Sequence, residues 1–246
     1  MEPDSRLLVF AKYPRAGRVK TRLLPDLTPN EAADLYRAFL CDSLATYVEK
    51  SARFETHLMI ADERDKEAFT SMIVESEVAS LNEIDRLLKV GIQSGDDLGE
   101  RLSAGFGRAF YEASGAVCAI GTDHPTLPDE FLLQAFDLLG SNDLVIGPAA
   151  DGGYYLIGMN QLYPSLFQSM PWSQETLFGE TIREAERLNL SIAKLPEWYD
   201  VDDVHSLFRL AAEPNLSARA PRTADILRTL NVSVGKEQRS TRGEAK

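Results

Sequence analysis

The chain has 246 residues, of which 44% are hydrophobic and 26% charged, as in an ordinary globular protein with a sizeable core. Its 38 acidic and 26 basic residues give a formal net charge of −12, which argues against nonspecific binding to nucleic-acid polymers or anionic membranes. No stretch approaches the roughly 20 apolar residues of a membrane span, and the N-terminus has no secretory pattern, so we expect a cytoplasmic protein.

Apolar runs of strand length alternate with stretches of helical period, which indicates an α/β protein with a mostly parallel sheet. Thr28, Pro29 and Glu31 form the capping box of the first helix. The Asp151-Gly152 pair between two apolar runs predicts a hairpin, which makes the sheet mixed. The strands are expected at 7–11, 54–62, 87–93, 116–123, 143–149, 154–159 and 191–195, and helices at 28–50, from 63, from 98, at 128–140, after 177 and within 203–230.

The strand at 116–123 is the most apolar and is therefore expected at the centre of the sheet. Cys41 and Cys118 fall inside apolar runs and read as core residues. We expect one domain over residues 1–232, followed by a polar and disordered tail at 233–246. The oligomeric state is left open, with a homodimer as one option.

A cationic loop follows the first strand: "AKYPRAGRVKTRL", residues 11–23, has no carboxylate. Gly17 gives the backbone a bend, and Arg and Lys side chains beside a helix start are natural partners of phosphate. The spacing matches neither a Walker loop nor a dinucleotide fingerprint. A solvated basic turn held by salt bridges is the alternative. The basic residues of this loop are Lys12, Arg15, Arg18, Lys20 and Arg22.

Two acidic segments also follow predicted strands, where ligands bind in open α/β sheets. In "AIGTDHPTLP", Asp123 is placed to bind a divalent cation, or else it caps the next turn. In "WYDVDDVHSL", Asp200 or Asp202 could join it, although the helix beginning near Val204 could absorb this charge alone. His124 reads as a structural residue.

The segment "QSGDDLGERLSAGF" joins a predicted strand to a helix. Gly95 and Gly99 provide backbone freedom, and Gly99 would let a flat ring approach the backbone. Asp97 either caps the helix or accepts a hydrogen bond from a ribose hydroxyl.

Together, "FAKYPRAGRVKTRL", "GDDLGERL", "IGTDHPTLP", "ADGGYYLIG" and "WYDVDD" resemble the GT-A-like nucleotide-diphospho-sugar transferase family found beside radical SAM proteins and assigned to arsenosugar biosynthesis. The resemblance covers residues 6–210. The chain is similar, more distantly, to phospholactate and molybdenum-cofactor guanylyltransferases. Their LxGGxGTR-type loop is replaced here by "KYPRAGRVKTR", which weakens the nucleotidyltransferase interpretation.

The resemblance implies a Rossmann-like three-layer α/β/α sandwich that binds a nucleotide-diphospho-sugar or a nucleoside triphosphate with Mg²⁺ or Mn²⁺. By position, the metal carboxylates would be Asp123 with Asp200 or Asp202. The phosphates would lie against Lys12, Arg15, Lys20 and Arg22, and the base and ribose against Gly95, Leu98 and Gly99.

The expected activity is glycosyl transfer from the sugar nucleotide to a small-molecule acceptor. Lys20 would stabilise the diphosphate leaving group, and Asp151 is the candidate base, although its turn role also explains it. Trp172, Tyr154 and Tyr155 are candidates for an acceptor pocket. The alternatives are nucleotidyl transfer to a small phosphorylated acceptor and a catalytically silent nucleotide-binding domain.

Overall fold

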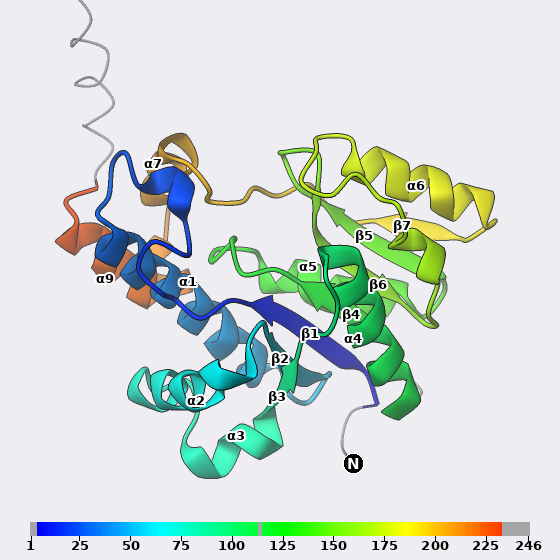
Figure 1. The fold of residues 1–246 in the computed structure, drawn as a ribbon, viewed down its shortest axis with the longest axis horizontal. Coiled ribbons are helices and arrows are strands. Elements are labelled where there is room, and N and C mark those ends of the chain that lie inside the picture. Colours follow the sequence, from blue (N-terminus) through cyan, green and yellow to red (C-terminus); the bar gives the residue numbers. More distant parts are fainter. Residues whose placement is uncertain (1–3, 113–114, 233–246) are drawn as a thin grey trace, which may run out of the picture.

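The computed structural model describes residues 4–112 and 115–232, so the predicted disordered tail lies outside the described residues. Within these described ranges, seven strands form one mixed sheet in the order β3-β2-β1-β4-β6-β5-β7, in which only β6 runs antiparallel to its neighbours (Figure 1). The strands are β1 (Arg6–Ala11), β2 (Glu55–Ile60), β3 (Leu88–Ile92), β4 (Val117–Ile120), β5 (Leu144–Pro148), β6 (Tyr154–Met159) and β7 (Ile192–Lys194).

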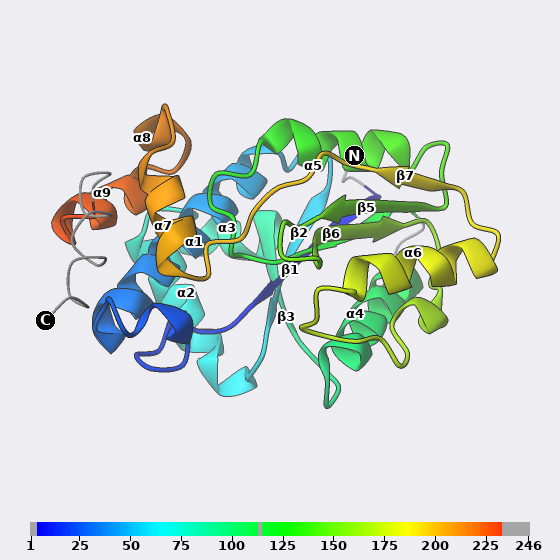
Figure 2. The same cartoon turned by 90° about the horizontal axis from the view of Figure 1, so that it is seen from above.

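Helices cover both faces of this sheet and complete a Rossmann-like three-layer arrangement, as predicted (Figure 2). One face carries α1, α2, α3 and α5, and the other carries α4 and α6. The α-helices are α1 (Pro29–Glu49), α2 (Lys66–Glu75), α3 (Leu81–Leu87), α4 (Leu98–Glu112), α5 (Asp129–Leu138), α6 (Leu177–Arg187), α7 (Val204–Ala211), α8 (Leu216–Arg219) and α9 (Pro221–Thr229). Short 3-10 helices are η1 (Thr21–Leu23), η2 (Glu63–Asp65) and η3 (Pro164–Leu166).

Local sequence explains where several of these elements begin and turn. The capping box of α1 is present, because the Glu31 N–H donates to Thr28 Oγ1 and the Thr28 N–H donates to the Glu31 carboxylate. The hairpin between β5 and β6 is confirmed, and its connection spans residues 149–153, one residue more than the expected 150–153. The sequence did not predict α3 as a helix distinct from α2, because its seven residues follow α2 after a short break.

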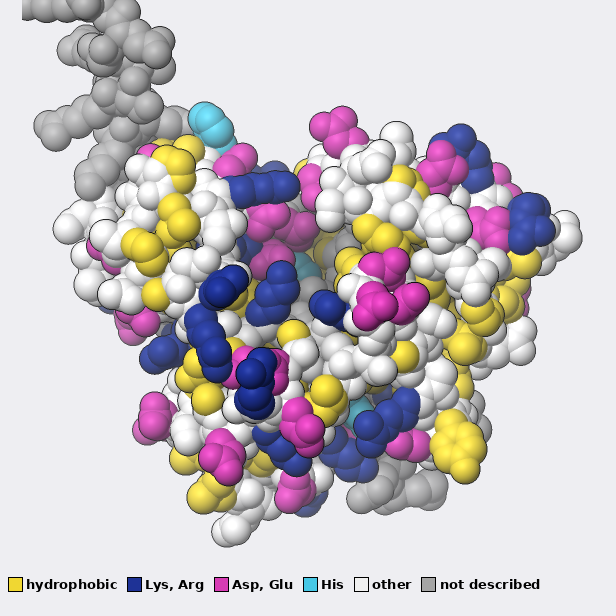
Figure 3. Space-filling view, in the orientation of Figure 1, with side chains coloured by type: hydrophobic (Ala, Val, Ile, Leu, Met, Phe, Trp, Pro, Cys, Tyr) yellow, Lys and Arg dark blue, Asp and Glu magenta, His cyan; other side chains and the backbone are white. Residues whose placement is uncertain are grey.

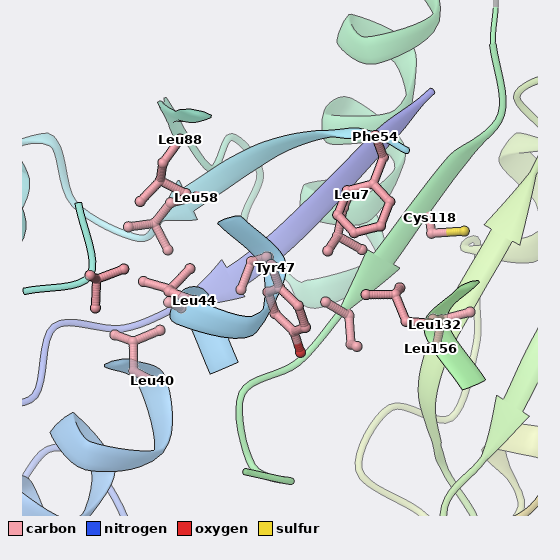
Figure 4. Packing of buried hydrophobic residues seen from close by; sticks show 14 of the residues in the cluster. Leu7, Leu40, Leu44, Tyr47, Phe54, Leu58, Leu88, Cys118, Leu132 and Leu156 are labelled. Atoms are coloured by element: carbon pink, nitrogen blue, oxygen red, sulfur yellow. The ribbon is translucent and has the colours of Figure 1, made fainter. Parts of the chain in front are cut away.

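The core is divided by the sheet, as the two-residue period of a strand requires. Leu7 faces α1, whereas its neighbour Leu8 faces α4. Cys41 and Cys118 are buried free thiols on the α1 side, as predicted. Figure 4 shows Cys118 among the buried leucines of this cluster. β4, from the most apolar run, is the middle strand of the seven, which confirms its predicted central place.

A third hydrophobic cluster lies beyond the sheet and determines the geometry of the site. Leu23 of η1 packs there with Phe39 of α1. The cluster also contains Val201, which precedes α7, and Leu207 of α7. This packing brings the loop after β1 against the segment that precedes α7, although the two are far apart in sequence. The cationic loop and the late aspartates therefore meet. Among the described residues, no helix is both long and apolar enough to cross a membrane.

Candidate active site

A cavity of about 480 Å³ opens at the carboxyl ends of β1, β3 and β4, the edge at which open α/β sheets bind ligands. Its walls come from the loop after β1, the turn after β4 and the first turn of α4. Figure 3 shows basic and acidic side chains meeting in the hollow between the α7 and α6 sides of the molecule. We call this the first cavity. Its charged lining residues are Lys12, Arg18, Lys20, Arg22, Arg101, Asp123 and Asp202.

Lys20 is the centre of this charge cluster. Its side chain is only 3% exposed, and its ammonium group contacts the carboxylates of Asp123 and Asp202 and donates to the Val201 carbonyl oxygen at 2.7 Å. The Nζ to Asp202 Oδ1 distance is 3.0 Å. Burial alone would lower the pKa of Lys20, but attraction to these two carboxylates outweighs it and raises the pKa above its ordinary value. Lys20 therefore carries a fixed positive charge in the cavity.

The backbone of Lys20 is also unusual. Its φ of 48° and ψ of 39° lie in the left-handed region, which costs an L-residue with a side chain roughly 1–2 kcal/mol. The residue stands immediately before η1, where the chain turns sharply. Packing of Leu23 beneath this turn and the ion pairs of the ammonium group hold it in place. The conformation aims the long side chain at the two aspartates.

The other basic residues of the loop divide into two groups. Lys12, Arg18 and Arg22 line the first cavity with Lys20. Arg15 instead pairs with Asp65 of η2, and neither it nor Gly17 lines the cavity. The salt-bridge alternative describes Arg15 fully, whereas Lys20 and Arg22 pair with carboxylates that line the cavity. Gly17 has φ of +72° with open space around the position of a Cβ, so its role is that of a turn.

The acidic side chains approach the cavity from two loops. The Val201 N–H donates to the Asp123 carbonyl oxygen at 2.8 Å, so the turn after β4 and the segment before α7 are joined directly. Asp123 and Asp202 are 43% and 38% exposed, so both carboxylates are accessible to a ligand. Arg22 Nη1 lies 3.7 Å from Asp202 Oδ2.

Asp200 has a different environment from the other two aspartates. Its Oδ1 lies 3.5 Å from Nδ1 of the buried His124. Burial alone would raise the pKa of the Asp200 carboxyl, but His124 and Lys20 outweigh it and lower the pKa. In the described part of the chain, no group of three or more His, Cys, Asp or Glu side chains is arranged to hold a metal ion.

A divalent cation at this site would have to bind through fewer protein ligands. Mg²⁺ typically takes one or two protein carboxylates and completes its shell with phosphate oxygens and water. Asp123 and Asp202 have that character, because they are partly exposed and already converge on one cation, the Lys20 ammonium. Asp200, the other expected metal ligand, faces His124 and does not contact Lys20 as Asp123 and Asp202 do.

The segment at the start of α4, where the base and ribose were expected to bind, is arranged differently from that expectation. Leu98 lines the first cavity, but Gly95, Asp97 and Gly99 do not. Asp97 caps the helix, accepting from the Glu100 N–H at 2.8 Å. Gly99 is covered, because a Cβ there would lie 2.8 Å from Nε1 of Trp172. The flat ring that approaches this glycine is the Trp172 indole.

Asp151 lies outside the first cavity. It lines a neighbouring cavity of about 400 Å³, together with Asp200, Asp203 and Arg209, and this second cavity shares Arg22 and Asp202 with the first. Asp151 Oδ1 accepts from the Gly153 N–H at 2.9 Å, as its turn role requires.

Several lining residues were not found from the sequence. Arg101 comes one helical turn after Leu98, so α4 periodicity could have indicated it. Gln93 at the end of β3 donates to the carbonyl oxygens of Ala11 and Met59. Tyr36 of α1 bonds Thr122 at 2.8 Å, and burial raises the pKa of Tyr36 to about 12. Nothing local in the sequence indicates Tyr36, since a tyrosine on an apolar helix face reads as core.

Comparison with solved structures gives relatives at two levels of similarity. A Desulfovibrio desulfuricans G20 protein, provisionally described as a nucleotide-diphospho-sugar transferase, is 30% identical with a TM-score of 0.83, and the match covers 94% of this chain and 99% of that one. A 4-diphosphocytidyl-2C-methyl-D-erythritol synthase from Anaerococcus prevotii is 11% identical, with coverages of 82% and 94%. An inositol-1-phosphate CTP transferase from T. maritima is 12% identical, with coverages of 92% and 97%.

The two cytidylyltransferases each have a TM-score of 0.51, so their similarity concerns the fold alone. No curated protein matches the sequence. A family model described as "Uncharacterized protein conserved in bacteria (DUF2064)" matches residues 44–174, more than half of the chain. With that match and a 30% identical relative aligned over nearly its whole length, the chain belongs to the DUF2064 family.

Proposed function

We propose that this protein is a metal-dependent transferase that uses a nucleotide-diphospho-sugar donor and transfers the glycosyl group to a small-molecule acceptor. The observation that carries the proposal is the first cavity, in which five basic side chains face two carboxylates at the carboxyl end of the sheet. These five basic side chains lie together although the protein as a whole has a formal net charge of −12. A diphosphate is the ligand that this arrangement suits best.

The donor's diphosphate would lie between the loop after β1 and the turn after β4. Lys20 gives a buried positive charge, and Lys12, Arg18, Arg22 and Arg101 give more exposed ones. Asp123 and Asp202 would hold Mg²⁺ or Mn²⁺, which when bound supplies further positive charge to phosphate oxygens. The exposed side chain of Leu98 offers an apolar surface for the nucleoside.

The bond that breaks joins the sugar's anomeric carbon to the diphosphate oxygen, and its electron pair stays with the diphosphate. An acceptor hydroxyl oxygen forms the new bond to the anomeric carbon and loses its proton, for which Asp151 is the candidate base. Charge grows on the leaving diphosphate during this step. Fixed cations such as Lys20 bind that growing charge more strongly than the ground state, and so lower the barrier.

Nucleotidyl transfer is the second candidate, because two cytidylyltransferases share the fold. The same cations would then stabilise pyrophosphate as the leaving group. The two reactions differ in their product, which makes them separable by experiment.

The protein should be incubated with UDP-, GDP-, CDP- and ADP-sugars and with each nucleoside triphosphate, in the presence of Mg²⁺ or Mn²⁺. Glycosyl transfer predicts slow release of nucleoside diphosphate from one sugar nucleotide and none in the Lys20→Met variant. Release of pyrophosphate from a triphosphate would instead establish nucleotidyl transfer. Binding of a nucleotide without any turnover would leave the catalytically silent nucleotide-binding domain. Failure of every nucleotide to bind would contradict all three interpretations.

A further inference from the structure

The second cavity adjoins the first and differs from it in charge. Its charged lining comprises four carboxylates, those of Asp151, Asp200, Asp202 and Asp203, against the guanidinium groups of Arg22 and Arg209. The first cavity has five basic side chains against two acidic ones. At about 400 Å³ the second cavity lies within the size range of small-molecule sites.

This charge pattern disfavours an anionic ligand in the second cavity. A phosphate there would lie among carboxylates, and unlike the first cavity no excess of cations would compensate the repulsion. A hydroxyl-rich, uncharged molecule meets no such penalty. Each hydroxyl can donate to a carboxylate oxygen and accept from a guanidinium N–H, so both kinds of lining group are satisfied at once.

Arg209 is the side chain best prepared for such a ligand. Its guanidinium lies over the Tyr199 ring, 3.7 Å from the ring centroid. Stacking occupies the flat face of the guanidinium and leaves its in-plane N–H groups for a ligand. Tyr199 is itself fixed, because it is buried and its hydroxyl donates to Glu213. The guanidinium group of Arg209 is therefore held in one plane before a ligand binds.

The shared wall fixes the relation between the two ligands. Arg22 and Asp202 line both cavities, so a molecule in the second cavity lies next to the diphosphate end of a donor in the first. Asp151, the candidate base, lines only the second cavity.

We propose that the second cavity is the acceptor site and that it takes an uncharged polyol, either cyclic or open-chain, with Arg209 and Asp151 among its hydrogen-bonding partners. This inference rests on the proposed glycosyl transfer. It assigns the acceptor class by chemistry and excludes a phosphorylated acceptor from this cavity.

Tryptophan fluorescence provides a direct test. The protein has two tryptophans, and Trp198 contacts Tyr199, with 5.6 Å between ring centroids. In a Trp172→Phe background, Trp198 is the sole reporter of the second cavity. Glycerol, mannitol, D-glucose, myo-inositol and inorganic phosphate should each be titrated at constant Mg²⁺ and ionic strength, with nucleoside diphosphate binding measured separately by calorimetry.

At least one polyol should change Trp198 emission saturably. Arg209→Ala should weaken that binding at least tenfold, and Asp151→Asn, which keeps the side chain's size, should weaken it measurably. The matched control is Arg187→Ala, an exposed arginine of α6 paired with Glu184. Binding of no polyol, equal binding in the Arg209 variant, or tighter Arg209-dependent binding of phosphate would each overturn the assignment.

Failure of the proposed function has a different signature. If no nucleotide binds the first cavity while a polyol still binds near Trp198 in an Arg209-dependent manner, the transferase proposal fails and the polyol site stands. If a donor is hydrolysed in a Lys20-dependent manner but no polyol binds or accelerates diphosphate release, only the acceptor inference fails.

Discussion

The two cavities share Arg22 and Asp202, yet one is rich in cations and the other in carboxylates. On the proposed function, this contrast would let one short edge of a sheet separate two ligands of different chemistry. The anionic donor would lie on the side of the β1 loop, and the uncharged acceptor on the side of α7. The wall between them is where the two ligands would react.

Removing the candidate base should have the largest effect. Asp151→Asn cannot accept a proton, so we expect turnover to fall by about 10²–10⁴-fold while nucleotide affinity stays unchanged. The comparison needs steady-state kinetics with Asp34→Asn, an exposed aspartate of α1, as the control. If the Asp151 variant turned over as fast as the wild type, Asp151 would not be the base.

Removing the buried ammonium should come next. Lys20→Met takes away a fixed charge beside the leaving diphosphate, which typically costs about 2.7–4 kcal/mol, or 10²–10³ in rate. Unlike the change at Asp151, it should also weaken nucleotide binding, measured by calorimetry. Lys66→Met, on the exposed face of α2, should behave as wild type. If the two lysine variants bound nucleotide equally well, the first cavity would not be the donor site.

Two neighbours in the cationic loop offer a finer test. Lys12→Gln should weaken nucleotide binding about tenfold, the equivalent of one charge-assisted hydrogen bond, because Lys12 lines the first cavity. Arg15→Gln should change it less than twofold, since Arg15 pairs with Asp65 outside the cavity. Equal losses in both would mean that net loop charge matters and not the position of each side chain.

The last effect concerns the stability of the fold at high pH and leaves ligand binding at neutral pH unchanged. Burial raises the pKa of Tyr36 to about 12, whereas a tyrosine in an unfolded chain titrates near 10. The folded state therefore holds this proton more tightly, and its contribution is complete below about pH 10 and is lost as the pH rises towards 12, by up to roughly 3 kcal/mol. Urea unfolding of wild type and Tyr36→Phe at pH 8, 10 and 11 should show a shallower decline in the variant. An equal decline of the unfolding free energy in both proteins would contradict this assignment of the pH dependence to Tyr36.

The two cavities also differ in how much of each the sequence reveals. The first cavity depends mainly on a contiguous run, residues 11–23, whose charge excess needs no structure to be noticed. The strand positions, the central place of β4 and the mixed sheet followed from apolar runs and a hairpin signal in the same way. The second cavity assembles Asp151, Arg22 and Arg209 from three distant segments, and no local pattern indicates that Arg209 stacks on Tyr199.

Within the first cavity, spacing alone could not decide which members of a motif face the ligand. Arg15 and Lys20 look equivalent in sequence, but Asp65 binds one and the aspartates at the carboxyl edge bind the other. Gly99 was expected beside a nucleobase because a glycine permits close approach. The approaching ring belongs to Trp172, and only tertiary packing determines that.

The hydrogen bond from the Val201 N–H to the Asp123 carbonyl oxygen has a consequence for biosynthesis. A growing polypeptide that has reached residue 190 already contains six of the seven strands and the whole cationic loop. It still lacks Asp202 and the backbone that secures Asp123. On the proposed function, nascent chains on the ribosome should therefore acquire affinity for nucleotide only after Asp202 has been translated.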